Sequence, residues 1–164
     1  MKFRIDQHIP AQLAAVEAAL IDRDFVAATA ELPKLGAAEV LENTRDGDRA
    51  HQRIRYRFTA QLSGAVTRVV DPGKLTWVDD ARYDLTTHTS RHRILPDNYP
   101  DRLQASYDVT LEPLGDSTRR LVTGELTVHV PLVGGRVERA IVDGLEEHAD
   151  AEADLLGRWI GERG

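Results

Sequence analysis

The strongest constraint in this sequence is the order of its hydrophobic periods, because each period favours one kind of secondary structure. Between residues 38 and 130, apolar and polar residues alternate in several runs, which is typical of half-buried strands. Between residues 136 and 160 the apolar residues recur every three or four positions, which predicts one amphipathic helix roughly 37 Å long. A chain of this kind buries the apolar face of its sheet against that helix.

The individual elements follow from these periods and from the turn residues between them. The prediction is a strand at 2–9, helices at 11–21 and 24–32, a hairpin of strands at 39–45 and 49–58, strands at 74–85, 87–95, 103–111 and 119–130, and the helix at 136–160. Short turns between successive strands make the sheet antiparallel. The stretch 60–70 has no clear period and stays unassigned.

Length and composition exclude several classes of protein. The 164 residues suit one domain, expected to span residues 1–164. A net charge of −6 argues against binding to nucleic acid or to an anionic membrane surface. The absence of cysteine excludes disulfides, thiolate nucleophiles and Cys-ligated zinc. With no secretory signal and no apolar run of about 20 residues, we expect a cytoplasmic protein without membrane insertion.

The inward faces of the predicted sheet and helix carry the candidate binding residues. One helix cannot fill the concavity of a curved sheet, so a gap that suits a ligand is expected between them. We predict that this site is lined by four aromatic residues, one histidine and three aliphatic residues, namely Tyr56, Trp77, Tyr83, Tyr107, His92, Leu126, Ile141 and Leu145. Ordinary core packing explains the aromatic residues equally well.

Histidines and one aspartate carry the candidate chemistry. On a strand, His88 and His92 would lie about 13 Å apart, too far to share a zinc ion, so no metal or other cofactor is expected. His92 shares the phase of Ile94 and points toward the cavity, either as a catalytic acid or base or as a structural histidine. Asp79 is in phase with Trp77. It would either pair with a base in the pocket or be turned outward by a bulge, and we favour the bulge.

Four arginines on one predicted hairpin strand invite a nucleic-acid hypothesis. Arg49, Arg53, Arg55 and Arg57 share the outer face of residues 49–58. No outward aromatic residues alternate with them, and the net charge is negative, so stacking and electrostatic attraction are both missing. We expect a solvated face paired with acids on neighbouring strands, such as Glu39.

One segment also resembles a known family. Residues 124–138, with the sequence GELTVHVPLVGGRVE, resemble the START-like superfamily together with Leu75-Thr76-Trp77 and Arg158-Trp159-Ile160. This superfamily is also called SRPBCC, polyketide cyclase/dehydrase or Bet v 1-like, and the chain is similar to an uncharacterised bacterial branch of it, a domain-of-unknown-function family. The resemblance covers Phe3 to Trp159. It implies an α+β helix-grip fold, in which a curved antiparallel sheet of about six or seven strands wraps around a long C-terminal helix and two short helices follow the first strand.

The resemblance also implies a cavity for an apolar or amphipathic small molecule, but the branch has no assigned reaction and carries over no catalytic residue. Three functions stay open. The first is a binding module for a hydrophobic small molecule, and the second is a cyclase/dehydrase-like enzyme in which His92 and a tyrosine transfer protons. The third is a structural or interaction domain whose pocket is filled by its own side chains. Ligand identity and oligomeric state also stay open.

Overall fold

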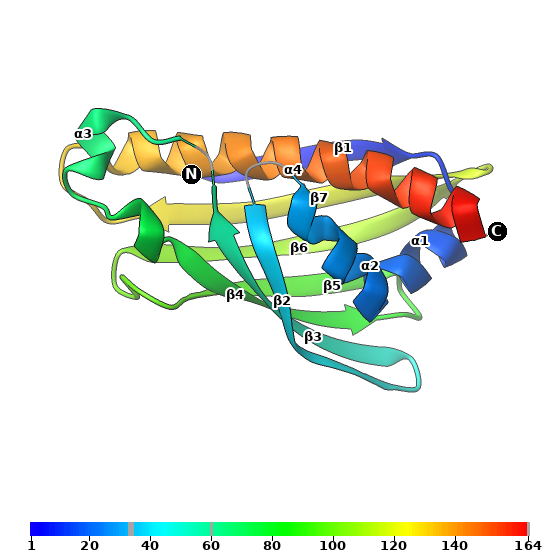
Figure 1. Cartoon of the computed structure of the whole chain (residues 1–164). Helices are drawn as coiled ribbons and strands as arrows, with labels where there is room; N and C mark the ends of the chain where they lie inside the picture. Colours follow the sequence, from blue (N-terminus) through cyan, green and yellow to red (C-terminus); the bar gives the residue numbers. More distant parts are fainter. Residues whose placement is uncertain (33–34, 60, 164) are drawn as a thin grey trace.

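One antiparallel sheet forms most of the molecule (Figure 1). The computed structural model describes residues 1–32, 35–59 and 61–163. Within that part, the strands are β1 (Lys2–Ile9), β2 (Leu35–Asp46), β3 (Arg49–Phe58), β4 (Thr76–Asp84), β5 (Thr89–Pro96), β6 (Leu103–Leu114) and β7 (Ser117–Val128). Their order across the sheet is β1-β7-β6-β5-β4-β3-β2, and every neighbouring pair is antiparallel, as predicted.

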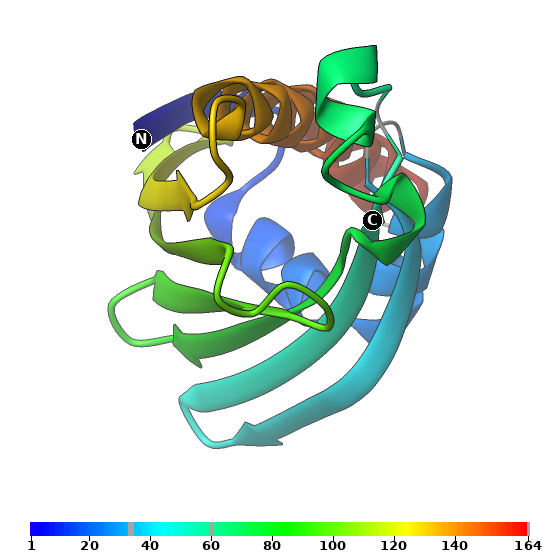
Figure 2. The same ribbon diagram turned by 90° about the vertical axis from the view of Figure 1, so that its left-hand side faces the viewer.

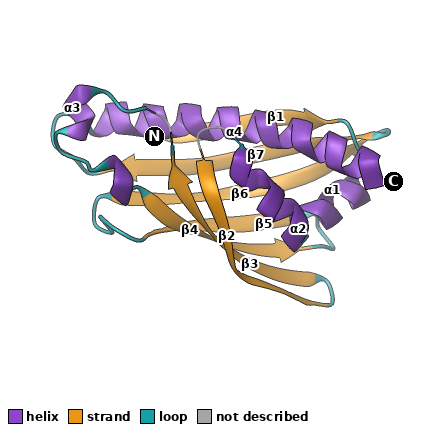
Figure 3. Ribbon diagram, in the orientation of Figure 1, coloured by secondary structure: helices purple, strands orange, loops and turns teal. Residues whose placement is uncertain are grey.

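The helices lie on the concave side and at the ends of this sheet (Figure 3). They are α1 (Leu13–Leu20), α2 (Arg23–Ala28), the 3₁₀ turn η1 (Thr29–Glu31), α3 (Gly64–Thr67), the 3₁₀ turn η2 (Pro72–Lys74) and α4 (Gly134–Arg163). Figure 2 shows the sheet curling around the interior, with α4 across its open side. The predicted α+β helix-grip fold is confirmed: the prediction is about six or seven strands, the described part of the chain has seven, and two short helices follow the first strand.

Local chemistry explains where the helices begin and how they dock. The Asp22 side chain accepts a hydrogen bond from the Asp24 amide at 2.7 Å and caps α2. The rings of Phe25 and Trp159 meet edge to face at 5.6 Å and join α2 to the end of α4. A Cβ at Gly157 would lie 2.8 Å from the Pro10 ring, so glycine lets α4 approach the segment after β1 closely.

The predicted alternation of buried and more exposed residues is confirmed in β1, β3, β6 and β7, whereas β4 buries Trp77, Val78 and Asp79 in succession. In β1, residues 3, 5, 7 and 9 are buried and the residues between them are exposed. Helix α4 buries the stripe that includes Val137, Ile141, Ala153 and Leu156 against the sheet.

The stretch 60–70, which the sequence left unassigned, contains the short helix α3, and Ser63 caps this helix by accepting a hydrogen bond from the Val66 amide. Residue 60 of this stretch lies outside the described residues.

The predicted bulge at Asp79 is wrong. Strand β4 keeps an unbroken register with both neighbours, and Asp79 pairs with Ile54 on β3 and with Ile94 on β5. Asp79 therefore stays on the concave face with Trp77, and it is 8% exposed. A buried carboxylate needs polar partners, and the next strands supply them, as described below.

His88 also differs from the prediction. Strand β5 begins at Thr89, and His88 lies in the preceding turn with a positive φ of 58°. His88 is therefore not on one strand face with His92. Its side chain turns toward α1 and contacts Glu17 there.

The arginines of β3 lie on the outer face, as predicted. Arg49 contacts Asp84 at 3.3 Å and Arg53 contacts Asp80 at 3.5 Å. Arg55 reaches Glu39 on β2 at 3.6 Å, which confirms the expected pairing with acids on neighbouring strands.

In the described part of the chain, every helix is too short or too polar to cross a bilayer.

Candidate functional site

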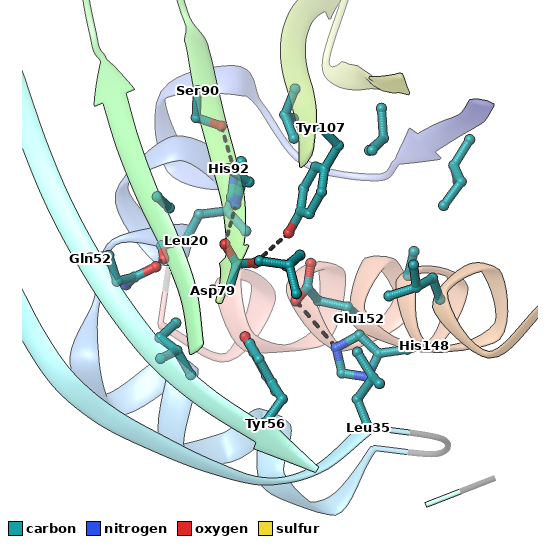
Figure 4. A pocket seen from close by; sticks show the side chains of 18 of the residues that line it. Leu20, Leu35, Gln52, Tyr56, Asp79, Ser90, His92, Tyr107, His148 and Glu152 are labelled. Carbon is teal, nitrogen blue, oxygen red and sulfur yellow. Dashed lines mark hydrogen bonds and ion pairs between the residues drawn. The ribbon is translucent and has the colours of Figure 1, made fainter. Parts of the chain in front are cut away.

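A cavity of about 160 Å³ lies between the concave face of the sheet and α4 (Figure 4). Its walls are mostly apolar, and they come from all seven strands of the described chain and from α1, α2, η1 and α4. All of the predicted lining residues border this cavity, namely Tyr56, Trp77, Tyr83, His92, Tyr107, Leu126, Ile141 and Leu145. The alternation of the strands and the helical stripe bring these side chains together from six separate elements.

A hydrogen-bonded chain of four side chains crosses the sheet wall of the cavity. Nδ1 of His92 lies 2.9 Å from Oδ1 of Asp79, and Nε2 of His92 lies 2.9 Å from the Ser90 hydroxyl. The Tyr107 hydroxyl donates to Oδ2 of Asp79. The rings of His92 and Tyr107 stack at 4.3 Å with an angle of 13° between them. Figure 4 shows this chain directed into the cavity.

The chemistry of Asp79 determines the state of its partner. An ionised carboxylate only accepts hydrogen bonds, so Nδ1 of His92 must carry the proton that it donates. In the neutral ring, Nε2 is then the acceptor, and the Ser90 hydroxyl donates to it. Asp79 thereby orients the ring and leaves Nε2 as the nitrogen that can take a proton.

A second polar cluster joins α4 to the sheet and centres on Arg120, which is 5% exposed. Its guanidinium donates to Oε1 of Gln7 at 2.6 and 2.8 Å, to Glu152 at 2.5 Å and to the Ala149 carbonyl at 3.1 Å. Gln7 in turn donates to Asp150 at 2.9 Å. Because each of these buried groups has a partner, the cluster offsets the cost of placing charges beside an apolar cavity.

The carboxyl group of Glu152 stays ionised inside this cluster. Burial is the largest single influence and opposes ionisation, but it is outweighed by the charge and the hydrogen bond of Arg120 together with smaller contributions from histidines when they are protonated, such as His148, whose Nε2 lies 3.8 Å from Glu152. The pKa of Glu152 is therefore held below its usual value. The Glu152 side chain therefore carries a negative charge at neutral pH, on the α4 side of the cavity.

Three tyrosine hydroxyls also face the cavity. Burial raises the pKa of Tyr56, Tyr83 and Tyr107, and the negative charge of Asp79 raises each further. All three therefore remain protonated hydroxyls that can donate. Tyr83 donates to Oε1 of Gln52 at 3.4 Å, while the Tyr56 hydroxyl has no hydrogen-bond partner among the described residues.

A hydrogen-bonded pair of side chains, His88 and Glu17, lies where α1 meets the turn before β5, and both residues border the cavity. Nδ1 of His88 lies 3.1 Å from both carboxylate oxygens of Glu17. His88 and His92 thus have different carboxylate partners. Among the described residues, no group of three or more histidine, aspartate and glutamate side chains is arranged to hold a metal ion.

Several polar residues of the site were absent from the predicted set. Arg120 is in phase with Val122 on β7, so the alternation does carry the signal for its inward side chain. His148 and Glu152 lie three and seven positions after Leu145, on the same helical face. The predicted set contains mainly apolar and aromatic residues, and for this reason Arg120, His148 and Glu152 are missing from it. Gln7 does share the inward face of β1 with Phe3 and Ile5.

The comparisons with known proteins agree with the fold. The family model described as "Protein of unknown function (DUF2505)" matches residues 4–160. No curated protein sequence matches the chain. Similar solved structures include TTHA0849 from Thermus thermophilus, with a TM-score of 0.71, 18% identity, and coverage of 100% of this chain and 99% of that one.

Two further similar structures are enzymes. Zhui aromatase/cyclase from Streptomyces sp. R1128 has a TM-score of 0.69 at 14% identity, over 99% of this chain and 94% of that one. Norcoclaurine synthase from Thalictrum flavum has a TM-score of 0.65 at 14% identity, over 99% of this chain and 87% of that one. At these identities the likeness concerns the fold, and it confirms the START-like, Bet v 1-like architecture expected from the sequence.

Proposed function

The chain belongs to the DUF2505 family, whose description assigns no function, and we propose from its cavity that it binds a compact, largely apolar small molecule between the sheet and α4. The observation that carries this proposal is the cavity itself, which stays open although apolar side chains surround it. A domain whose pocket is filled by its own side chains would have no such space.

The size of the cavity supports a ligand of about one or two rings. Pockets for drug-sized ligands usually measure roughly 300–1,000 Å³, whereas an apolar cavity of about 150 Å³ suffices for benzene. At about 160 Å³, the cavity belongs with the second group. This favours a ring compound over a long lipid chain. Two proteins of the same fold, an aromatase/cyclase and a norcoclaurine synthase, are enzymes of small molecules, which agrees with this choice.

The test combines native mass spectrometry of the purified protein with a thermal-shift screen of small ring compounds. A co-purifying molecule or a concentration-dependent rise in Tm is the expected result. Ala105 borders the cavity, so Ala105→Phe should fill it and abolish the shift. Ala18→Phe, on the exposed face of α1, is the matched control and should keep it. An unchanged response in Ala105→Phe would place the ligand elsewhere and refute the proposal.

A second candidate function is proton transfer in the manner of a cyclase or dehydrase. It is favoured by the chain of Asp79, His92 and Ser90, because Asp79 orients His92 and leaves Nε2 as the proton acceptor. The Ser90 hydroxyl covers Nε2, so it has to rotate away before a ligand can give up its proton there.

Turnover of any compound found in the screen tests this second function. His92→Gln should abolish turnover, since it removes the acceptor. Ser90→Ala should retain or increase it, since it uncovers Nε2. Full turnover by His92→Gln would remove the proposed base.

A further inference from the structure

The charges that border the cavity are unbalanced. The charged side chains among its described lining residues are Glu17, Asp79 and Glu152 on one side and Arg120 on the other. With histidines counted as uncharged, three carboxylates face one guanidinium, an excess of two negative charges. A site with this excess attracts a cation more strongly than an anion, most of all where water is excluded.

The N–H groups of Arg120, the single guanidinium among the described lining residues, are mostly engaged in hydrogen bonds within the protein. Arg120 donates to Gln7 with two nitrogens, to Glu152 with the third, and to the backbone carbonyl of Ala149. Its side chain is only 6% exposed. A ligand carboxylate would have to break these hydrogen bonds and would lie beside Glu152. The cavity therefore disfavours the binding of an anionic ligand.

Acceptors, in contrast, remain available. Each oxygen of Asp79 accepts one hydrogen bond, from His92 or from Tyr107, and a carboxylate oxygen has a second lone pair. Oε2 of Glu152 has His148 no closer than 3.8 Å. The Tyr56 hydroxyl points toward Asp79 in Figure 4 and has no hydrogen-bond partner among the described residues. These groups can surround a donor that enters the cavity.

We propose that the cavity selects a compact apolar amine, whose ammonium group lies between Asp79 and Glu152 while its ring packs against the apolar wall. The inference rests on the proposed binding function and names the chemical class of its ligand. Tyr56 adds a hydroxyl oxygen as a third acceptor. The rings of Tyr56 and Trp77, 6.5 Å apart, and the side chain of Ile141 supply apolar contact area.

Isothermal titration calorimetry at pH 7 with three probes of similar size tests the inference: 2-phenylethylamine, 2-phenylethanol and 3-phenylpropionate. We expect the amine to bind roughly tenfold or more tightly than the carboxylate, with the alcohol between them. Asp79→Asn and Glu152→Gln should each lower the affinity for the amine and leave that for the alcohol nearly unchanged. Asp108→Asn removes an exposed carboxylate that pairs with Arg91 outside the cavity, and it is the control that should change nothing.

Glu152→Gln should also increase the affinity for 3-phenylpropionate, because Arg120 then lacks its carboxylate partner. A purely structural role of Glu152 would not produce this reversal. Circular dichroism verifies that each variant is folded.

Each failure has a separate meaning. If the carboxylate binds as tightly as the amine, the inference is overturned while the binding function stands. If the amine binds equally well to Asp79→Asn, Glu152→Gln and the wild type, it binds elsewhere and the inference is also overturned. If none of the three probes binds, the amine class is refuted, and the binding function is then decided by the thermal-shift screen of neutral ring compounds.

Discussion

Gly124 on β7 offers the sharpest test of how the cavity wall is packed. It lies opposite Phe3 on β1 and opposite Tyr107 on β6. A Cβ at this position would lie 2.5 Å from Cβ of Tyr107, 2.6 Å from the Ser106 carbonyl oxygen and 2.7 Å from the ring of Phe3. Two of these atoms are fixed by the backbone, so no side-chain rotation relieves the contact. Gly124→Ala therefore forces β7 away from β6.

The magnitude follows from two opposing effects. Overpacking of this kind costs about 3 kcal/mol, and the reduced backbone freedom of alanine in the unfolded chain returns up to about 1 kcal/mol. We expect a net loss of about 2 kcal/mol, or a decrease in Tm of roughly 4–8 °C. Urea unfolding followed by far-UV circular dichroism, with linear extrapolation to water, measures the free energy of unfolding.

Gly161→Ala is the matched control for this measurement. Gly161 lies in α4, and a Cβ there would meet nothing within 4 Å. The substitution should stabilise the protein by up to about 1 kcal/mol. If Gly124→Ala proves as stable as the wild type, the close approach of β6, β7 and Phe3 is not what requires glycine, and the reasoning is refuted.

The buried ion pair supports two further predictions. Arg120→Met removes the guanidinium partner of Glu152 and should lower the free energy of unfolding by about 3–5 kcal/mol in urea titrations, while Arg120→Met/Glu152→Leu should recover most of that loss. The pKa of Glu152 is lower in the folded protein than its usual value of 4.5, so its stabilisation is present above pH 4.5 and is lost as the pH falls through the folded pKa. Wild-type stability should therefore decrease on acidification below pH 4.5, and Glu152→Gln should show a weaker decrease in the same titration; parallel curves would contradict this.

Much of the fold follows directly from local patterns. Alternation along a strand decides which side chains share a face, because successive Cβ atoms point to opposite sides of the sheet. This rule places Tyr56, Tyr83, His92 and Tyr107 on the concave face before any pairing is known. The helical stripe does the same for Ile141 in α4.

The polar chemistry of the site was harder to predict. A carboxylate in phase with Trp77 is costly in an apolar core, and for that reason the sequence favoured a bulge that turned Asp79 outward. The hydrogen bonds from His92 on β5 and Tyr107 on β6 remove that cost. These partners lie 13 and 28 positions away in the chain, so no local pattern shows that they meet.

The sequence by itself determined the order of the elements, the antiparallel sheet and the face on which most apolar strand residues lie, since all of these follow from local periodicity. Only the tertiary structure decided which buried polar groups pair. Arg120, Gln7 and Glu152 come from β7, β1 and α4, and they meet because the sheet closes around the helix. The physical reason is that the free energy of a buried charge depends on partners brought close by folding, whereas the preference of an apolar residue for the interior needs no specific partner.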